Sequence, residues 1–144
     1  MDGYTWKNMN RIIELKNVGD KVYVRGILSG DNTYLDYTQF RMTGKIAASG
    51  NCNALWNYND LNAPLKIYCG YYMFWYCLSL TTAPELPATE LANGCYSNMF
   101  NDCTSLTIAP ELPATTLEEE CYAYMFRNCT SLITSPELPA TTLT

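Results

Sequence analysis

Apolar and polar positions recur with a period of 26 residues along the second half of the chain. One wording is written three times with small changes, as CGYYMFWYCLSLTTAPELPATELANG, CYSNMFNDCTSLTIAPELPATTLEEE and CYAYMFRNCTSLITSPELPATTLT, starting at Cys69, Cys95 and Cys121. The same offset aligns a methionine, a second cysteine and two leucines in each copy, namely Met73/Met99/Met125, Cys77/Cys103/Cys129, Leu80/Leu106/Leu132 and Leu86/Leu112/Leu138. A fixed period of this length is typical of repeat folds, in which each copy adds one layer to a continuous core.

Each copy changes its periodicity halfway. In the third copy, Leu117, Cys121, Met125 and Cys129 recur at every fourth residue, so one apolar stripe would run down about three turns of an α-helix. Threonines and glutamates around the start of this stripe have the spacing of a capping box. This part of each copy is therefore predicted to be a helix.

The remaining part of each copy cannot be a second helix. In the second copy, Pro110 and Pro113 would each remove an intrahelical hydrogen bond and clash with the preceding turn. We expect a short strand at about Leu106 to Ala109, with the proline at its edge. Because strands stack about 4.8 Å apart and helices are about 10 Å wide, such layers must curve toward the strands. The sequence thus predicts an α/β repeat fold, a curved solenoid with a short strand and a helix in every 26-residue repeat.

The wording of the repeat resembles that of a known family. The order Cys-x-x-Leu, a Pro-flanked Leu and then Met-Phe-x-x-Cys is similar to the leucine-rich repeats of BspA-like bacterial surface proteins, and APELPATTL is similar to repeats of gut-Bacteroides surface proteins. The resemblance covers about half of the chain, from Leu65 onward. It implies a right-handed leucine-rich-repeat solenoid on the bacterial cell surface or outside the cell, used for adhesion or protein binding, and it carries over no catalytic residue.

The first part of the chain differs in texture from the repeats. Three strand-like runs are separated by turn compositions, and they cover Arg11 to Leu15, Lys21 to Leu28 and Gln39 to Ala48. We predict three parts: a small antiparallel β cap in residues 1–50, a junction with a degenerate first repeat in residues 51–68, and a solenoid of about three repeats in residues 69–144. The last repeat is incomplete, so we expect a segment of a longer chain whose uncapped C-terminal end is available for self-association.

Charge and hydropathy exclude two classes of partner. The net charge is −5, there is no histidine, and the nine basic residues are scattered, which argues against nucleic-acid binding. No apolar run approaches the ~18 residues of a membrane-spanning helix. The chain also begins without the pattern of a secretory signal, so a signal and an anchor are absent from this sequence.

The seven cysteines invite a metal or disulfide interpretation. Their repeated spacing is C-x7-C, however, and not the C-x2-C of zinc knuckles. Eight residues of helix span about 12 Å, which exceeds the ~7 Å limit between the Cα atoms of a disulfide. We therefore predict two ladders of buried thiols and no metal, with Cys52 outside both ladders as the residue to test for a free or intermolecular thiol.

Candidate binding residues lie where the copies differ or where polar groups repeat. On the predicted concave strand face they are Thr81, Thr82, Thr107, Ile108, Ile133 and Thr134. Glu85, Glu111 and Glu137 repeat one layer apart and form either a solvated rim or a cation-binding ladder. Trp56, in an irregular loop, serves either a binding surface or packing between cap and solenoid.

Nothing in the sequence favours catalysis. Without histidine the usual acid–base and nucleophile-activating pairs are missing, there is no glycine-rich phosphate loop, and no cofactor is expected. Two function classes remain. The first is a non-catalytic cell-surface binding or adhesion module for a protein or glycan, and the second is a structural element whose open ends stack into oligomers or fibres.

Overall fold

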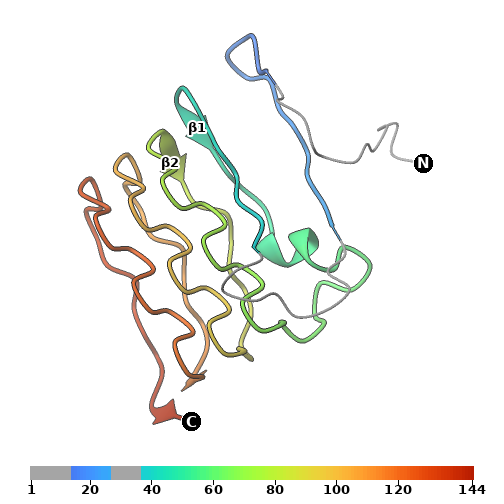
Figure 1. Cartoon of the computed structure of the whole chain (residues 1–144), viewed down its shortest axis with the longest axis vertical. Coiled ribbons are helices and arrows are strands. Elements are labelled where there is room, and N and C mark those ends of the chain that lie inside the picture. Colours follow the sequence, from blue (N-terminus) through green and yellow to red (C-terminus); the bar gives the residue numbers. More distant parts are fainter. Residues whose placement is uncertain (1–13, 27–36) are drawn as a thin grey trace.

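The computed structural model of this protein describes residues 14–26 and 37–144. In these residues there is no α-helix. Regular structure consists of one 3-10 turn, η1 (Cys52–Leu55), and four short strands, β1 (Ile46–Ala47), β2 (Leu80–Thr82), β3 (Thr116–Leu117) and β4 (Thr142–Leu143). β1 pairs in parallel with β2 (Figure 1), and β3 pairs in parallel with β4. The predicted leucine-rich-repeat solenoid, with a helix in every repeat, is therefore wrong.

The segment predicted to be a helix is a run of tight turns. In the second copy, alternate N–H groups donate to the carbonyl three residues earlier, at 3.1 to 3.2 Å, from Cys95, Ser97, Met99, Asn101 and Cys103. Every fourth residue has a positive φ, namely Tyr68, Tyr72 and Tyr76, then Gly94, Asn98 and Asp102, then Glu120, Tyr124 and Asn128. A right-handed helix has no place for such residues, so the turn at each of them prevents helix formation.

The intervening N–H groups bind the next copy. Those of Tyr96, Asn98, Phe100 and Asp102 donate to carbonyls of the third copy at 2.8 to 3.0 Å, and the first copy makes the same bonds to the second. We call the copies rungs, with residues 69–94 as the first, 95–120 as the second and 121–144 as the third. Their successive loops lie side by side in sequence order in Figure 1. Main-chain hydrogen bonds therefore join each rung to its neighbours.

A period of four residues is common to a helix and to these turns. Two successive turns advance the chain by four residues, so Cys121 and Met125 come to the same side, as they would on a helix. The buried face was predicted correctly, because Met73, Met99 and Met125 are all buried. The local conformation was predicted wrongly, because apolar spacing alone does not distinguish these two ways of returning to the same side.

The predicted strand and helix start also need correction. The strand expected near Ile108 is reduced to single parallel bridges, which join Ile108 to Thr82 and to Thr134. The predicted capping box falls on β3, whose two residues are extended and pair with β4. The main-chain N–H of Thr141 extends this pairing by donating to Thr115 O at 3.0 Å. The chain therefore enters each run of turns from an extended corner.

The interior is built from columns of identical side chains. Phe40, Phe74, Phe100 and Phe126 stack with centroid separations of 5.2, 5.5 and 5.8 Å and interplanar angles of 23°, 13° and 7°. Aromatic rings at such distances add stabilisation beyond the area that they bury. The leucine columns follow the same order, since Leu80 and Leu106 are fully buried while Leu132 is only half-buried. The second rung is thus the best-packed layer.

The N-terminal part does not form the predicted antiparallel cap. β1 runs parallel to β2, and residues 14–26 contain no strand. Two of the three strand-like runs lie partly outside the described residues. Phe40 N–H donates to Met73 O at 2.7 Å, so the segment before the first rung adds one more layer to the same stack. The division of the chain at residues 50 and 68 stays a prediction.

Candidate functional site

The outer side of the turns differs from rung to rung. The first turns carry Tyr68, Tyr71 and Tyr72; 26 residues later stand Gly94, Ser97 and Asn98, and 26 residues later again stand Glu120, Ala123 and Tyr124. The middle residues are smaller or more deeply buried than the tyrosines of the first rung. A hollow of about 470 Å³ results, and we call it the tyrosine trough. This volume lies within the range of small-molecule sites.

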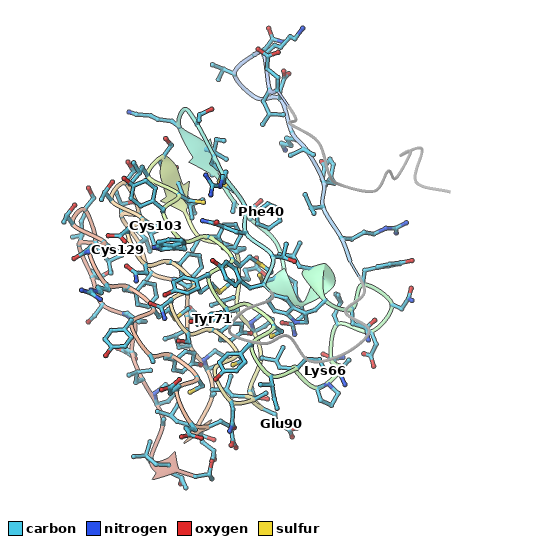
Figure 2. All side chains as sticks on the ribbon, viewed as in Figure 1. Phe40, Lys66, Tyr71, Glu90, Cys103 and Cys129 are labelled. Atoms are coloured by element: carbon cyan, nitrogen blue, oxygen red, sulfur yellow. The ribbon has the colours of Figure 1, made fainter. Side chains whose placement is uncertain are left out.

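The first wall of the trough is a cluster of packed tyrosine rings. Tyr71 lies 4.3 Å from Tyr72 and 5.2 Å from Tyr68, measured between centroids, and Tyr37 meets it edge-on at 5.7 Å. In Figure 2, Tyr71 lies between the end marked by Lys66 and the end marked by Phe40. Burial, a hydrogen bond with Tyr72 and the neighbouring phenols raise the pKa of Tyr71 to about 12. The Tyr71 phenol therefore keeps its proton at neutral pH.

Gly94 makes room for the first wall. A Cβ atom at this position would overlap the ring of Tyr68, so the ring lies directly over the glycine backbone. Gly94 also has a φ of +59°, which glycine adopts without the steric cost of a side chain. A side chain here would displace Tyr68 and with it the end of the wall.

The floor is a chain of buried polar groups on the second rung. Asn101 Nδ2 donates to Asn98 Oδ1 at 2.9 Å, Asn98 Nδ2 donates to Ser97 Oγ at 3.1 Å, and Ser97 Oγ donates to Ala123 O at 3.3 Å. All three polar side chains are buried. Because each donor in this chain has an acceptor, the floor is fixed before any ligand arrives.

The second wall is polar and exposed. The guanidinium carbon of Arg127 lies 5.8 Å from the centroid of the Tyr124 ring, a distance compatible with a cation–π contact. Glu120 lines the same wall. Within residues 14–26 and 37–144, no ion pair engages either charge. The trough therefore offers a carboxylate and a guanidinium with free hydrogen-bonding capacity.

The residues predicted on the strand face lie apart from this trough. Thr82, Ile108 and Thr134 are exposed and follow one another in a single row of parallel bridges, with Ile133 80% exposed beside them. The other two threonines are partly buried, and their hydroxyls donate within the stack: Thr81 Oγ1 to Ile46 O at 3.2 Å and Thr107 Oγ1 to Thr81 O at 3.3 Å. The structure thus brings the six residues into one strip, of which four side chains face solvent.

The glutamates and the tryptophan are placed differently. Glu85, Glu111 and Glu137 are all exposed. In the described part of the chain, no group of three or more His, Cys, Asp or Glu side chains is placed to hold a metal ion. Trp56 is only 4% exposed and lies 6.1 Å from the ring of Tyr96. Of the two roles considered for Trp56, burial therefore supports packing, and its indole is not part of a binding surface.

All seven cysteines are described, and none forms a disulfide. The second thiol of each rung donates to a phenylalanine carbonyl of the preceding layer, from Cys77 to Phe40, Cys103 to Phe74 and Cys129 to Phe100, each at 3.1 Å. Figure 2 marks Cys103 and Cys129 on neighbouring rungs. The two ladders of buried thiols are confirmed, although Cys129 is only half-buried. Cys52 is buried too, so its thiol is free but enclosed.

We expect the thiols to resist labelling in the folded protein. Burial raises the pKa of the Cys52, Cys95 and Cys103 thiols, and the thiolate is the reactive form. Treatment of the native protein with an aromatic disulfide reagent at neutral pH should label Cys129 slowly and the other thiols only after denaturant is added. Rapid reaction of several thiols before unfolding would contradict the buried ladders.

The same shifts predict a loss of stability at alkaline pH. Burial raises the pKa of the Cys77 thiol from 9.0 to about 11. The folded state therefore holds this proton more tightly than the unfolded state, so the stabilisation is fully present below about pH 9 and is lost as the pH rises through about 11. Urea midpoints measured between pH 7 and pH 10.5 should fall as the pH rises. Midpoints that stay constant or rise would contradict the burial.

Comparison with protein-family models, with curated proteins and with solved structures found no match to this chain. Among the residues that the structure describes, no helix is long and apolar enough to cross a membrane. The site therefore has to be interpreted from its own geometry.

Sequence reasoning missed the tyrosine trough. It took the strand face as the variable surface, whereas the turns vary more strongly between copies. The signal was present in the first copy, where GYYMFWYC stands against YSNMFNDC in the second copy. Aligning the outer positions of the copies, and not only the apolar ones, would have placed four tyrosines opposite a serine and an asparagine.

Proposed function

We propose that this protein is a non-catalytic binding module of the cell surface, which presents the outer side of its rungs to a protein or glycan. One contrast carries the proposal: the inward columns repeat the same residues in each rung, whereas the outward positions change to give a hollow with aromatic and charged walls. A structural interior needs constant residues, while a recognition surface needs different ones.

The thiol chemistry is compatible with a location outside the cell. Buried cysteines with raised pKa values are poor nucleophiles, so they do not need disulfide partners to survive in an oxidising medium. The resemblance of the repeat wording to bacterial surface proteins favours the same location. The net charge of −5 and the absence of histidine favour binding over nucleic-acid contact or acid–base catalysis.

The folded protein should bind at least one member of an array of extracellular-matrix proteins and glycans. The heat-unfolded protein serves as the control, because a surface made by stacking disappears on unfolding. Absence of binding to every member of the array would contradict the binding module.

A second candidate is an assembly element, and a specific feature of the third rung favours it. The N–H groups of Tyr122, Tyr124, Phe126 and Asn128 correspond to those that join the first two rungs to their successors, but among the described residues they have no acceptor. Such a row of free donors can template pairing with another chain. Sedimentation velocity over a wide range of concentrations decides this point, because a monomer at every concentration would remove the assembly function.

A further inference from the structure

We propose that the tyrosine trough binds a neutral hexopyranose oligosaccharide. The inference rests on the proposed binding function and names the ligand class of that site. Its argument uses three features of the trough: exposed aromatic faces, a set of polar groups with both donors and acceptors, and a balance of charge.

The aromatic walls suit the apolar face of a sugar ring. A pyranose presents axial C–H bonds on one face, and these carry partial positive charge, while the face of an aromatic ring is negative. Tyr71 is held by its neighbouring rings on one wall, and Tyr124, which is 66% exposed, stands on the other. Because a tyrosine ring loses few rotamers on binding, contact with such a wall costs little conformational entropy.

The polar groups suit hydroxyls, which donate and accept at once. Glu120 supplies acceptor oxygens, Arg127 supplies a planar set of donors, and the phenols of the first wall supply both. Neither charge is occupied by an ion pair within the described residues. Adjacent sugar hydroxyls can bind a carboxylate or a guanidinium through two parallel hydrogen bonds, which fixes the orientation of the ring.

The charges of the trough argue for a neutral ligand. One carboxylate and one guanidinium balance each other locally, and the whole chain carries a net charge of −5, which repels polyanions such as acidic polysaccharides. A small aromatic hydrocarbon would leave both charges desolvated and unpaired, which costs free energy.

A proline-rich peptide is the competing ligand, since such peptides dock in aromatic grooves. Proline has no N–H group, so a proline-rich segment offers carbonyl acceptors to Arg127 but almost no donors to Glu120. A sugar satisfies both residues. The presence of the carboxylate in the wall therefore favours the saccharide.

The test uses the intact chain and four neutral probes, maltohexaose, cellohexaose, laminarihexaose and mannohexaose, with a decaproline peptide as the competing ligand. Binding is measured by isothermal titration calorimetry at millimolar ligand. Tyr124→Ala removes the exposed platform, and Tyr124→Phe retains it. Tyr76→Ala is the matched control, because Tyr76 lies outside the trough, is 61% exposed and has a φ of 59°, close to the 54° of Tyr124.

We expect at least one hexaose to bind, with an affinity that falls about tenfold in Tyr124→Ala and by less than about threefold in Tyr124→Phe and Tyr76→Ala. Glu120→Gln should weaken binding by a similar factor to Tyr124→Ala, because it removes the charged acceptor. Circular dichroism spectra that match the parent chain show that each variant is folded.

Three results would overturn the saccharide while leaving the binding module in place if the protein still binds a matrix protein. These are no heat of binding with any hexaose, preferential binding of decaproline, and hexaose binding that Tyr76→Ala weakens as much as Tyr124→Ala does. Failure of every ligand on the protein and glycan array would instead remove the proposed function itself.

Discussion

Replacing Met99 with aspartate should lower the free energy of unfolding by about 3 to 5 kcal/mol, because it buries a charge without a partner. Met99 is 0% exposed and lies in the second rung, which has a neighbour on each side. Its N–H donates to Tyr96 O at 3.1 Å, and its carbonyl accepts from Phe74 N–H at 2.9 Å, so the residue takes part in both the turn and the stack. Unfolding by urea, followed by circular dichroism, measures the loss.

Two controls separate burial from other effects of this substitution. Met99→Leu retains the volume and the apolar character, so it should cost less than about 1.5 kcal/mol. Ile133→Asp places the same carboxylate on a side chain that is 80% exposed and should change stability by less than about 0.5 kcal/mol. A midpoint for Met99→Asp that matches the parent chain would show that the methionine does not face the interior.

The second large effect is expected for Phe100→Ala, at about 3 to 5 kcal/mol. Phe100 is fully buried and stacks on Phe74 at 5.5 Å and on Phe126 at 5.8 Å, so its removal opens a cavity in the middle of the column. The surrounding main chain is tied by hydrogen bonds to both neighbouring rungs, which limits collapse into the cavity.

Phe126→Ala is the matched comparison. Phe126 is only half-buried and, among the described rings, stacks on Phe100 alone, so its truncation should cost clearly less. A double-mutant cycle between Phe74 and Phe100 should give a coupling of about 0.5 to 1.5 kcal/mol from their stacking. Equal costs for the two single substitutions, with no coupling in the cycle, would contradict the aromatic column.

The sequence predicted which side chains face inward, and it misjudged how the backbone brings them there. Cysteine, methionine and leucine recur in every copy because each rung must present the same surface to the next. The period of four that suggested a helix follows equally from pairs of turns, and the difference lies in the residues at the positive-φ positions. In the second rung these are Gly94, Asn98 and Asp102, the types that tolerate a left-handed conformation.

That signal is weak in the other two rungs, which explains why the helix was plausible. Tyr72 and Tyr124 occupy the same left-handed position, although tyrosine has no local preference for it. Their conformation is imposed by the stack: Tyr72 N–H donates to Ser97 O at 3.3 Å, and Tyr124 O accepts from Arg127 N–H at 3.1 Å. Contacts between residues so distant in sequence cannot be read from local spacing.

The candidate site was harder to predict than the core for a related reason. The strand-face threonines and isoleucines were found because their positions vary between copies, and the structure does bring them into one strip. The tyrosine trough depends on a contrast of side-chain size between neighbouring rungs. Such a contrast becomes visible only when the residues that lie next to each other in the stack are known.

Amide hydrogen exchange, measured by NMR on the monomer, tests most directly that the copies are stacked rungs of turns. The N–H groups of Tyr96, Asn98, Phe100 and Asp102, which donate to the third rung, should exchange slowly. Their equivalents in the third rung, at Tyr122, Tyr124, Phe126 and Asn128, should exchange fast, while Met125 and Arg127 between them are held by turn hydrogen bonds. Uniform protection from Met125 to Cys129, as an α-helix would give, would contradict the account.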